Sequence, residues 1–362
     1  MKTIRWSLAA WLLMTLAFIT TARHSAVAQD EPTVAKDSVR VKADNLDATM
    51  VNGRRQEGSS WLPAIEFRVN GPIPKDTQLS AEFSLPTNKQ WLKFDCGSVV
   101  RAIAPDQWWK AGCGLHSGAV REDKSVTYTG MVEFAIHSRN EVMGTNVTLF
   151  TGKMKVGKYL ARPKAPSTGY DYYVDDDWRI PIAYLGFEAS PTKASAGGSH
   201  NTKVNQGAPL IAAIAFRGNP GDVKAHLFYQ GKDLSQAICR SGLDSDWNPA
   251  KYEWSEIDCK LPGVYGTPPG PGYGEAPRHA LSQNPGEYEI RVVSGGHLAR
   301  SLKFTADAGG KFDNGISTEN KIGSDRVILP IQVLGDQGPW DHNAWKTGAF
   351  YGNPLTGFIA IP

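Results

Sequence analysis

Short runs of alternating apolar and polar residues dominate this chain. Apolar side chains recur at every second position in segments such as 64–70 and 286–293, whereas the spacing of an amphipathic helix is scarce. Such alternation is typical of β-strands that bury one face. The 37 glycines and 23 prolines supply turn residues between these runs. The pattern therefore predicts an all-β protein.

The alternating runs occur in the same order in both halves of the chain. The corresponding segments are 39–41 and 178–180, 64–70 and 213–219, 79–85 and 223–229, 130–136 and 286–293, and 147–150 and 302–305. Between the third and fourth strand pairs, each half carries two cysteines with a tryptophan before the second one. We align Trp109 with Trp254 at this position. The repeat predicts two β-sandwich domains, at 38–163 and 176–335, joined by a linker at 164–175.

Each predicted domain resembles immunoglobulin-like and fibronectin-like modules, because it offers roughly seven short strands with frequent turns. The resemblance rests on this strand pattern and implies two tandem immunoglobulin-like sandwiches. The four cysteines lie two in each half, so we expect the pairs Cys96–Cys113 and Cys239–Cys259. Their separations of 17 and 20 residues are short for a bridge between the two sheets of such a domain. We expect each bridge to close a local excursion, which stabilises the fold by about 3 kcal/mol.

The N-terminal segment has the three parts of a cleaved signal peptide, over residues 1–28. Lys2 and Arg5 precede an apolar run, which ends at the small-residue motif 26–28. The compact form looks bacterial and predicts a secreted or periplasmic protein without stable membrane insertion after cleavage. With Lys2, Arg5 and Arg23 removed, the chain is balanced at 36 basic and 36 acidic residues. Because the basic residues form no cluster, we expect no nucleic-acid partner.

The last segment, 336–362, has no counterpart in the first half. It is rich in aromatic residues, with Trp340, Trp345, Phe350, Tyr351 and Phe358. A disordered tail is poor in such residues. We therefore expect this C-terminal extension to pack on the second domain.

Motifs for catalysis are absent from the sequence. The chain has no nucleophile elbow, no zinc-protease helix motif and no phosphate-binding loop. We expect no catalytic residues and no cofactor, although a site assembled by folding from distant residues remains a third hypothesis.

Two acidic clusters are weak candidates for calcium, which binds several oxygen ligands. One is the run Asp175, Asp176 and Asp177, and the other is the pair Asp244 and Asp246. We favour a solvated hinge for the first cluster and an exposed turn for the second.

Exposed aromatic residues are the candidate binding residues. Trp108 is predicted to face outward, because its neighbour Trp109 faces the opposite side of the strand. Trp247 lies in the second cysteine loop, and Tyr265 and Tyr273 lie in a Gly/Pro-rich loop at 261–274. Aromatic rings stack on sugars and anchor protein partners. We expect a non-enzymatic binding or structural protein with a protein or cell-envelope partner, and a carbohydrate ligand is the alternative.

Overall fold

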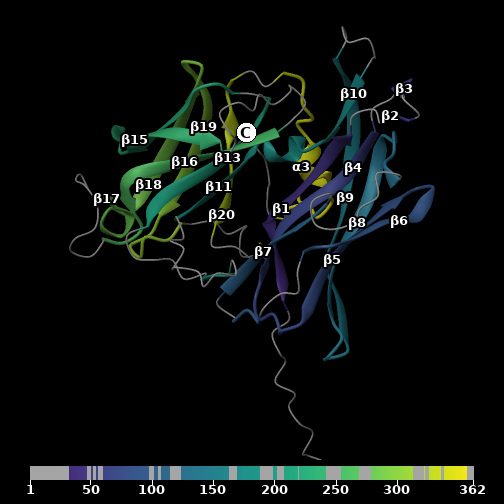
Figure 1. The fold of residues 1–362 in the computed structure, drawn as a ribbon. Helices are drawn as coiled ribbons and strands as arrows, with labels where there is room; N and C mark the ends of the chain where they lie inside the picture. Colours follow the sequence, from purple (N-terminus) through teal and green to yellow (C-terminus); the bar gives the residue numbers. More distant parts are fainter. Residues whose placement is uncertain are drawn as a thin grey trace, which may run out of the picture. The chain divides into compact units, whose positions relative to one another are not determined.

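The computed structural model describes most of the chain after residue 31. The described residues are 32–46, 50–51, 54–55, 60–97, 102–104, 107–114, 124–162, 169–187, 199–201, 208–218, 220–241, 254–268, 279–312, 322, 326–335 and 338–356. Nearly all regular structure in this part of the chain is β-strand (Figure 1), which confirms the predicted all-β class. The α-helix α3, Ala344–Thr347, and two short 3-10 turns, η2 at Asp177–Arg179 and η3 at Leu281–Gln283, complete the described elements.

The first half of the fold contains two separate sheets. Its strands are β1 Thr33–Leu46, β2 Met50–Val51, β3 Arg54–Arg55, β4 Ser60–Asn70, β5 Thr77–Leu85, β6 Asn88–Asp95, β7 Gln107–Cys113, β8 Gly130–Asn140, β9 Thr145–Arg162, β10 Gly169–Val174 and β12 Ser199–Asn201. One sheet has the order β1-β4-β7-β12 and the other β10-β9-β8-β5-β6, while β2 and β3 pair with each other. Alternate residues of both sheets, such as Phe67 of β4 and Phe83 of β5, enter the first core.

The second half of the fold is one long, curled sheet. Its strands are β11 Ile182–Phe187, β13 Pro209–Arg217, β14 Val223–Tyr229, β15 Lys232–Ser241, β16 Trp254–Tyr265, β17 His279–Ala280, β18 Gly286–Ser294, β19 His297–Ala306, β20 Val327–Pro330 and β21 Gln332–Val333. The order is β20-β11-β13-β16-β15-β14-β18-β19-β21, and β17 pairs with β16. Its apolar face encloses the second core, which includes Ile214, Leu227 and Ile290.

The strand order of the two halves is the same. The neighbours β1-β4-β7 correspond to β11-β13-β16, and β9-β8-β5-β6 correspond to β19-β18-β14-β15. In the second half, Arg240 and Ser241 of β15 also pair with Asp258 and Ile257 of β16. This extra pairing merges the two layers into one sheet.

The two cores share strands. Along β11, Ile182 and Tyr184 belong to the first core, whereas Ala183 and Leu185 belong to the second. Along β13, Ala213 faces the first core and Ile214 the second. Because each strand presents its two faces to different cores, the halves are fused through β11 and β13.

The sequence predicted a linker at 164–175 between two separate domains, whereas the two halves share strands. Part of the segment 164–175 forms the strand β10, which pairs with β9. The expected solvated hinge at Asp175–177 is also wrong, because Asp176 and Asp177 are buried. The reason is their position directly before β11, in the wall between the two cores.

Both predicted disulfides are present. Cys96 bonds to Cys113, and Cys239 bonds to Cys259. The second bond joins the adjacent strands β15 and β16. The first joins different sheets, because Cys96 follows β6 and hydrogen-bonds to Leu79 of β5, while Cys113 ends β7. Our expectation of a local excursion is therefore wrong for Cys96–Cys113, because this bond links the two sheets of the first half.

An arginine stacked on a tryptophan recurs in both halves. Arg68 lies over the ring of Trp108 at 5.3 Å, and Arg217 lies over Trp254 at 5.2 Å. Trp108 and Trp254 each precede the second cysteine of their half by five residues. The alignment of Trp109 with Trp254 is therefore wrong by one residue. Trp108 is the structural counterpart of Trp254.

The C-terminal extension packs mainly on the first half, not on the second as we expected. Trp345, Phe350 and Tyr351 belong to the first core, and α3 lies beside the strands of that half (Figure 1). The Tyr351 ring contacts Phe134 of β8 edge-on at 5.6 Å. A side chain at position 152 of β9 would collide with Phe134, so Gly152 makes room for these rings.

The backbone of the extension is fixed at the same place. The Lys153 N–H of β9 donates to the Tyr351 carbonyl at 2.7 Å. Phe350 and Tyr351 both have left-handed backbone angles, with φ of 46° and 59°. Non-glycine residues keep such angles only where their surroundings hold them. The extension is thus a built part of the first core.

The two disulfides fit a protein exported to an oxidising compartment. No helix among the described residues is long and apolar enough to span a membrane. The predicted signal peptide at 1–28 lies outside the described residues.

Candidate functional site

A groove of about 580 Å³ lies where the two halves are fused. We call it the junction groove. It is lined by residues 40–45 of β1, Glu66 of β4, residues 172–174 of β10, Asp176, Arg179, Ala215 of β13 and residues 254–256 of β16. Both halves therefore contribute walls, and charged and aromatic side chains meet there.

A bulge in β1 directs Arg40 to this groove. The pairing of β1 with β4 shifts register between Ala35 and Arg40, and such a bulge re-aims the side chains that follow it. Ser38 closes the bulge by donating to the Ala35 carbonyl at 2.6 Å and accepting the Arg68 N–H at 2.8 Å. Arg40 then forms an ion pair with Glu256 of β16, 216 residues later.

Glu256 binds two guanidinium groups. Besides its pair with Arg40, its carboxylate lies 3.7 Å from Nη1 of Arg179. Burial alone would raise the pKa of Glu256, but Arg40, Arg179 and Arg326 outweigh burial and lower it below the ordinary value. Glu256 is therefore a carboxylate at neutral pH.

Arg179 is the centre of the buried network beneath the groove. Its Nε donates to Asp176 at 3.1 Å, and its Nη2 donates to the Val39 carbonyl at 2.8 Å and the Tyr351 hydroxyl at 3.2 Å. Burial alone would lower the pKa of Arg179, but the oxygens of Tyr351 and Asp176 raise it. Burial raises the pKa of Asp176, although Arg179 acts in the opposite direction. The guanidinium thus stays charged and holds its neighbours in place.

Four buried polar atoms at the groove and the network have no hydrogen-bond partner among the described residues. They are Asp37 Oδ1, Arg179 Nη1, Tyr184 Oη and Trp254 Nε1. Burial raises the pKa of Tyr184, so its hydroxyl stays protonated. Unpaired buried donors and acceptors are uncommon in folded proteins and mark places of functional interest.

Two aromatic rings form one wall of the groove. Tyr173 of β10 and Trp254 of β16 lie with ring centroids 5.9 Å apart, and both are half-buried. A side chain at position 157 would collide with the Tyr173 ring, so Gly157 of β9 makes room for it. Arg217 stacks on the other ring. The wall is therefore held from both halves of the fold.

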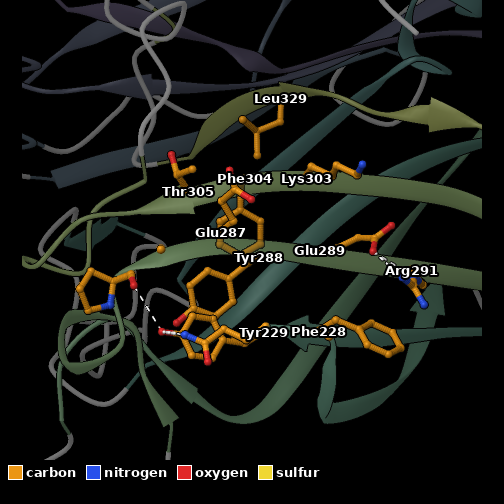
Figure 2. Close-up of a pocket in the computed structure, with 14 residues that line it drawn as sticks. Phe228, Tyr229, Glu287, Tyr288, Glu289, Arg291, Lys303, Phe304, Thr305 and Leu329 are labelled. Carbon is orange, nitrogen blue, oxygen red and sulfur yellow. Dashed lines mark hydrogen bonds and ion pairs between the residues drawn. The ribbon is translucent and has the colours of Figure 1, made fainter.

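A second hollow, of about 820 Å³, lies over β14, β18 and β19. Figure 2 shows Tyr288 and Phe304 in the middle of this hollow and the Glu289–Arg291 pair at one end. That ion pair, at 2.8 Å, joins neighbours on one strand, and Arg291 is exposed. Tyr288 is tied down by its bond to the Asn284 carbonyl. This hollow is an open sheet face, and we favour the junction groove because buried charges converge there.

The predicted binding residues are not brought together in the described structure. Trp108 is half-buried on β7 under Arg68, and Tyr265 is buried at the end of β16. Trp247 and Tyr273 lie outside the described residues. Neither Trp108 nor Tyr265 lines the junction groove.

The acidic run at 175–177, one of the two candidate calcium clusters, contacts other protein groups. Asp176 pairs with Arg179, and Asp177 accepts the Asp341 N–H of the extension at 2.8 Å. Asp175 lies 3.4 Å from the Lys155 ammonium. Among the described residues, no three acidic, histidine or cysteine side chains are grouped to hold a metal. Asp244 and Asp246 lie outside the described residues.

Sequence reasoning missed Arg40, Arg179, Glu256 and Tyr173. Only the repeat carried a signal, because it matched segment 39–41 with 178–180 and so paired Arg40 with Arg179. Both arginines meet at Glu256. Trp108 and Trp254 each lie five residues before the second cysteine of their half. Counting back from these cysteines would also have matched the two tryptophans.

The comparisons with known proteins do not indicate a function, so a function must be argued from the geometry of the junction groove. No protein-family model matches this chain, and no curated protein matches it significantly.

Glu256 predicts how stability depends on pH. Its pKa in the folded protein is lower than in the unfolded chain, so its contribution is present above the unfolded pKa and is lost as pH falls through the folded pKa. We expect Glu256→Gln to cost about 1.5–3 kcal/mol at pH 7. The cost should shrink as pH falls below the ordinary glutamate pKa of 4.5. Urea unfolding at several pH values measures this, and a cost that is constant from neutral to acid pH would contradict it.

Proposed function

We propose that this chain is an exported, non-enzymatic binding protein whose ligand lies in the junction groove. The observation that carries this is the convergence of Arg40, Glu256, Tyr173 and Trp254 at one groove, from strands on both sides of the fusion. The buried network fixes these walls before a ligand arrives. Preformed sites bind with a smaller loss of conformational entropy than mobile ones.

The state of the Glu256 carboxylate supports binding rather than catalysis. A general acid or base works best with a pKa near the working pH. Glu256 has a lowered pKa and is bound by two arginines. Its carboxylate thus serves to hold the groove walls.

We further propose that both halves are copies of one immunoglobulin-like sandwich. The shared strand order, the repeated Arg–Trp stack and the paired disulfides support this. The pairing of β15 with β16 is a departure that belongs to the second copy. In this scheme, fusion of the two copies through β11 and β13 created the groove.

Thermal unfolding with a panel of small probes tests the binding function. The panel contains neutral oligosaccharides, free amino acids and dicarboxylates. We expect one class to raise the Tm by roughly 5 °C at about 100 times its Kd. Trp254→Ala should abolish the shift, whereas Trp108→Ala, which changes the equivalent stack outside the groove, should leave it intact.

Recovery of the probe after long incubation separates binding from catalysis. We expect mass spectrometry to return the ligand unchanged. Conversion of the ligand by the wild type but not by Trp254→Ala would refute the non-enzymatic assignment. A panel in which no probe gives a Trp254-dependent shift would refute the groove as the binding site.

A further inference from the structure

We infer that the junction groove binds a neutral oligosaccharide that lies along β1. This inference rests on the binding function proposed above and specifies the ligand class. Three features of the groove lead to it: the pairing of its charges, its aromatic wall and its length.

The charges at the floor of the groove are already paired with each other. Arg40 binds Glu256, and Arg179 lies between Glu256 and Asp176. A charged ligand would have to compete with these pairs, because each ion already has its counter-ion. A hydroxyl group has no such conflict, since it can donate to a carboxylate and accept from a guanidinium at once. The floor therefore favours a ligand with many hydroxyls and no net charge.

The aromatic wall supplies the second element of sugar recognition. The rings of Tyr173 and Trp254 are tilted by 36° to each other, and neither is fully buried. Aromatic rings offer apolar faces, and a pyranose ring offers C–H groups to pack against them. The indole N–H of Trp254 is itself buried and lacks an acceptor among the described residues, so the wall offers a ligand its ring surfaces rather than this donor.

The shape of the groove favours a chain over a single sugar. Six consecutive residues of β1, from Arg40 to Asn45, line it. At the rise of a β-strand, they extend over about 17 Å. That length exceeds one pyranose ring. We therefore expect affinity to grow with the number of linked sugars.

Isothermal titration calorimetry on the purified full chain tests this inference. The probes are linear hexasaccharides of glucose, xylose and mannose, with their monosaccharides, and the charged hexamers of galacturonate and glucosamine. We expect at least one neutral hexasaccharide to bind at least tenfold more tightly than its monosaccharide. Binding should stay unchanged between about 50 mM and 500 mM salt, because screening acts only on charged ligands.

Two substitutions at one position and a matched control locate the ligand. Trp254→Ala should weaken hexasaccharide binding at least tenfold, whereas Trp254→Phe, which keeps a ring but loses the N–H, should weaken it less. Trp108→Ala removes the equivalent tryptophan of the first half and should leave binding unchanged. Circular dichroism and Tm measurements show whether each variant is folded, and a misfolded Trp254→Ala leaves Trp254→Phe as the deciding variant.

The outcomes separate this inference from the function on which it rests. If only charged hexamers, amino acids or dicarboxylates bind and Trp254 is required, the groove is a binding site but the neutral oligosaccharide is refuted. Equal affinity for monosaccharide and hexasaccharide would refute an extended ligand along β1. If no probe shows Trp254-dependent binding, both the inference and the proposed function are refuted.

Discussion

Replacement of Tyr351 by alanine should lower the free energy of unfolding by about 3–5 kcal/mol, the usual cost of removing a large aromatic side chain from a core. The Tyr351 side chain is buried in the first core. Its ring contacts Phe134 and Trp178, and its hydroxyl accepts the Val41 N–H at 3.0 Å. Without this side chain, the extension loses its main apolar anchor to β8 and β9. Urea unfolding followed by tryptophan fluorescence measures the loss.

Two further variants divide this effect into its parts. Tyr351→Phe keeps the ring and should cost only about 1–3 kcal/mol, because the Val41 N–H and Arg179 lose an oxygen partner. Trp340→Ala changes an aromatic residue of the same extension that stacks on His342 outside both cores. It should cost less than about 1 kcal/mol. A Tyr351→Ala loss no larger than that of Trp340→Ala would mean that the extension does not stabilise the first core.

The sequence predicted features that depend on local pattern. The alternation in 64–70 lies within β4, and residues 213–217 of the matching run lie within β13. The pairing of the four cysteines followed from their even distribution between the halves. The alternation of a strand depends on residues that are neighbours along the chain, and the cysteine pairing follows from the repeat. Both can be seen in a single sequence.

The parts that the sequence did not predict depend on contacts across the fold. Tyr351 and Phe134 are 217 positions apart, and nothing in an aromatic segment says which core it enters. Asp176 and Asp177 were predicted to lie in a solvated hinge, because acidic runs are usually exposed. Their burial follows from the sharing of β11 and β13 by two cores. The junction groove arises from this sharing, so its residues could not be grouped from their spacing.

The groove and the extension meet at Arg179. Its guanidinium binds Asp176, lies beneath the Arg40–Glu256 pair and donates to the Tyr351 hydroxyl. It also lies over the Trp178 ring at 4.4 Å. One side chain therefore links the groove floor, the wall between the cores and the C-terminal extension. Loss of this cation should disturb all three at once.

Arg179→Met should accordingly lower the free energy of unfolding by about 3–5 kcal/mol at pH 7, because it leaves Asp176 buried without its cation. The loss should be smaller at acid pH. Burial already raises the pKa of Asp176, and removal of Arg179 raises it further. A carboxyl group with a raised folded pKa favours folding below its unfolded pKa and opposes it as pH rises through the folded value. Urea unfolding at pH 7 and near pH 4 compares the two states.

The double variant Asp176→Leu/Arg179→Met provides the control. A buried ion pair can often be replaced by apolar residues of similar size with little loss. We therefore expect the double variant to regain more than half of the stability that Arg179→Met loses at pH 7, and its remaining loss relative to the wild type to change less with pH than that of Arg179→Met. It also keeps Arg40 and Glu256 at the groove surface, so ligand binding should persist in it at reduced affinity. A double variant as unstable as Arg179→Met would instead attribute the cost to lost packing against Trp178 and Tyr351, and not to the unpaired charge of Asp176.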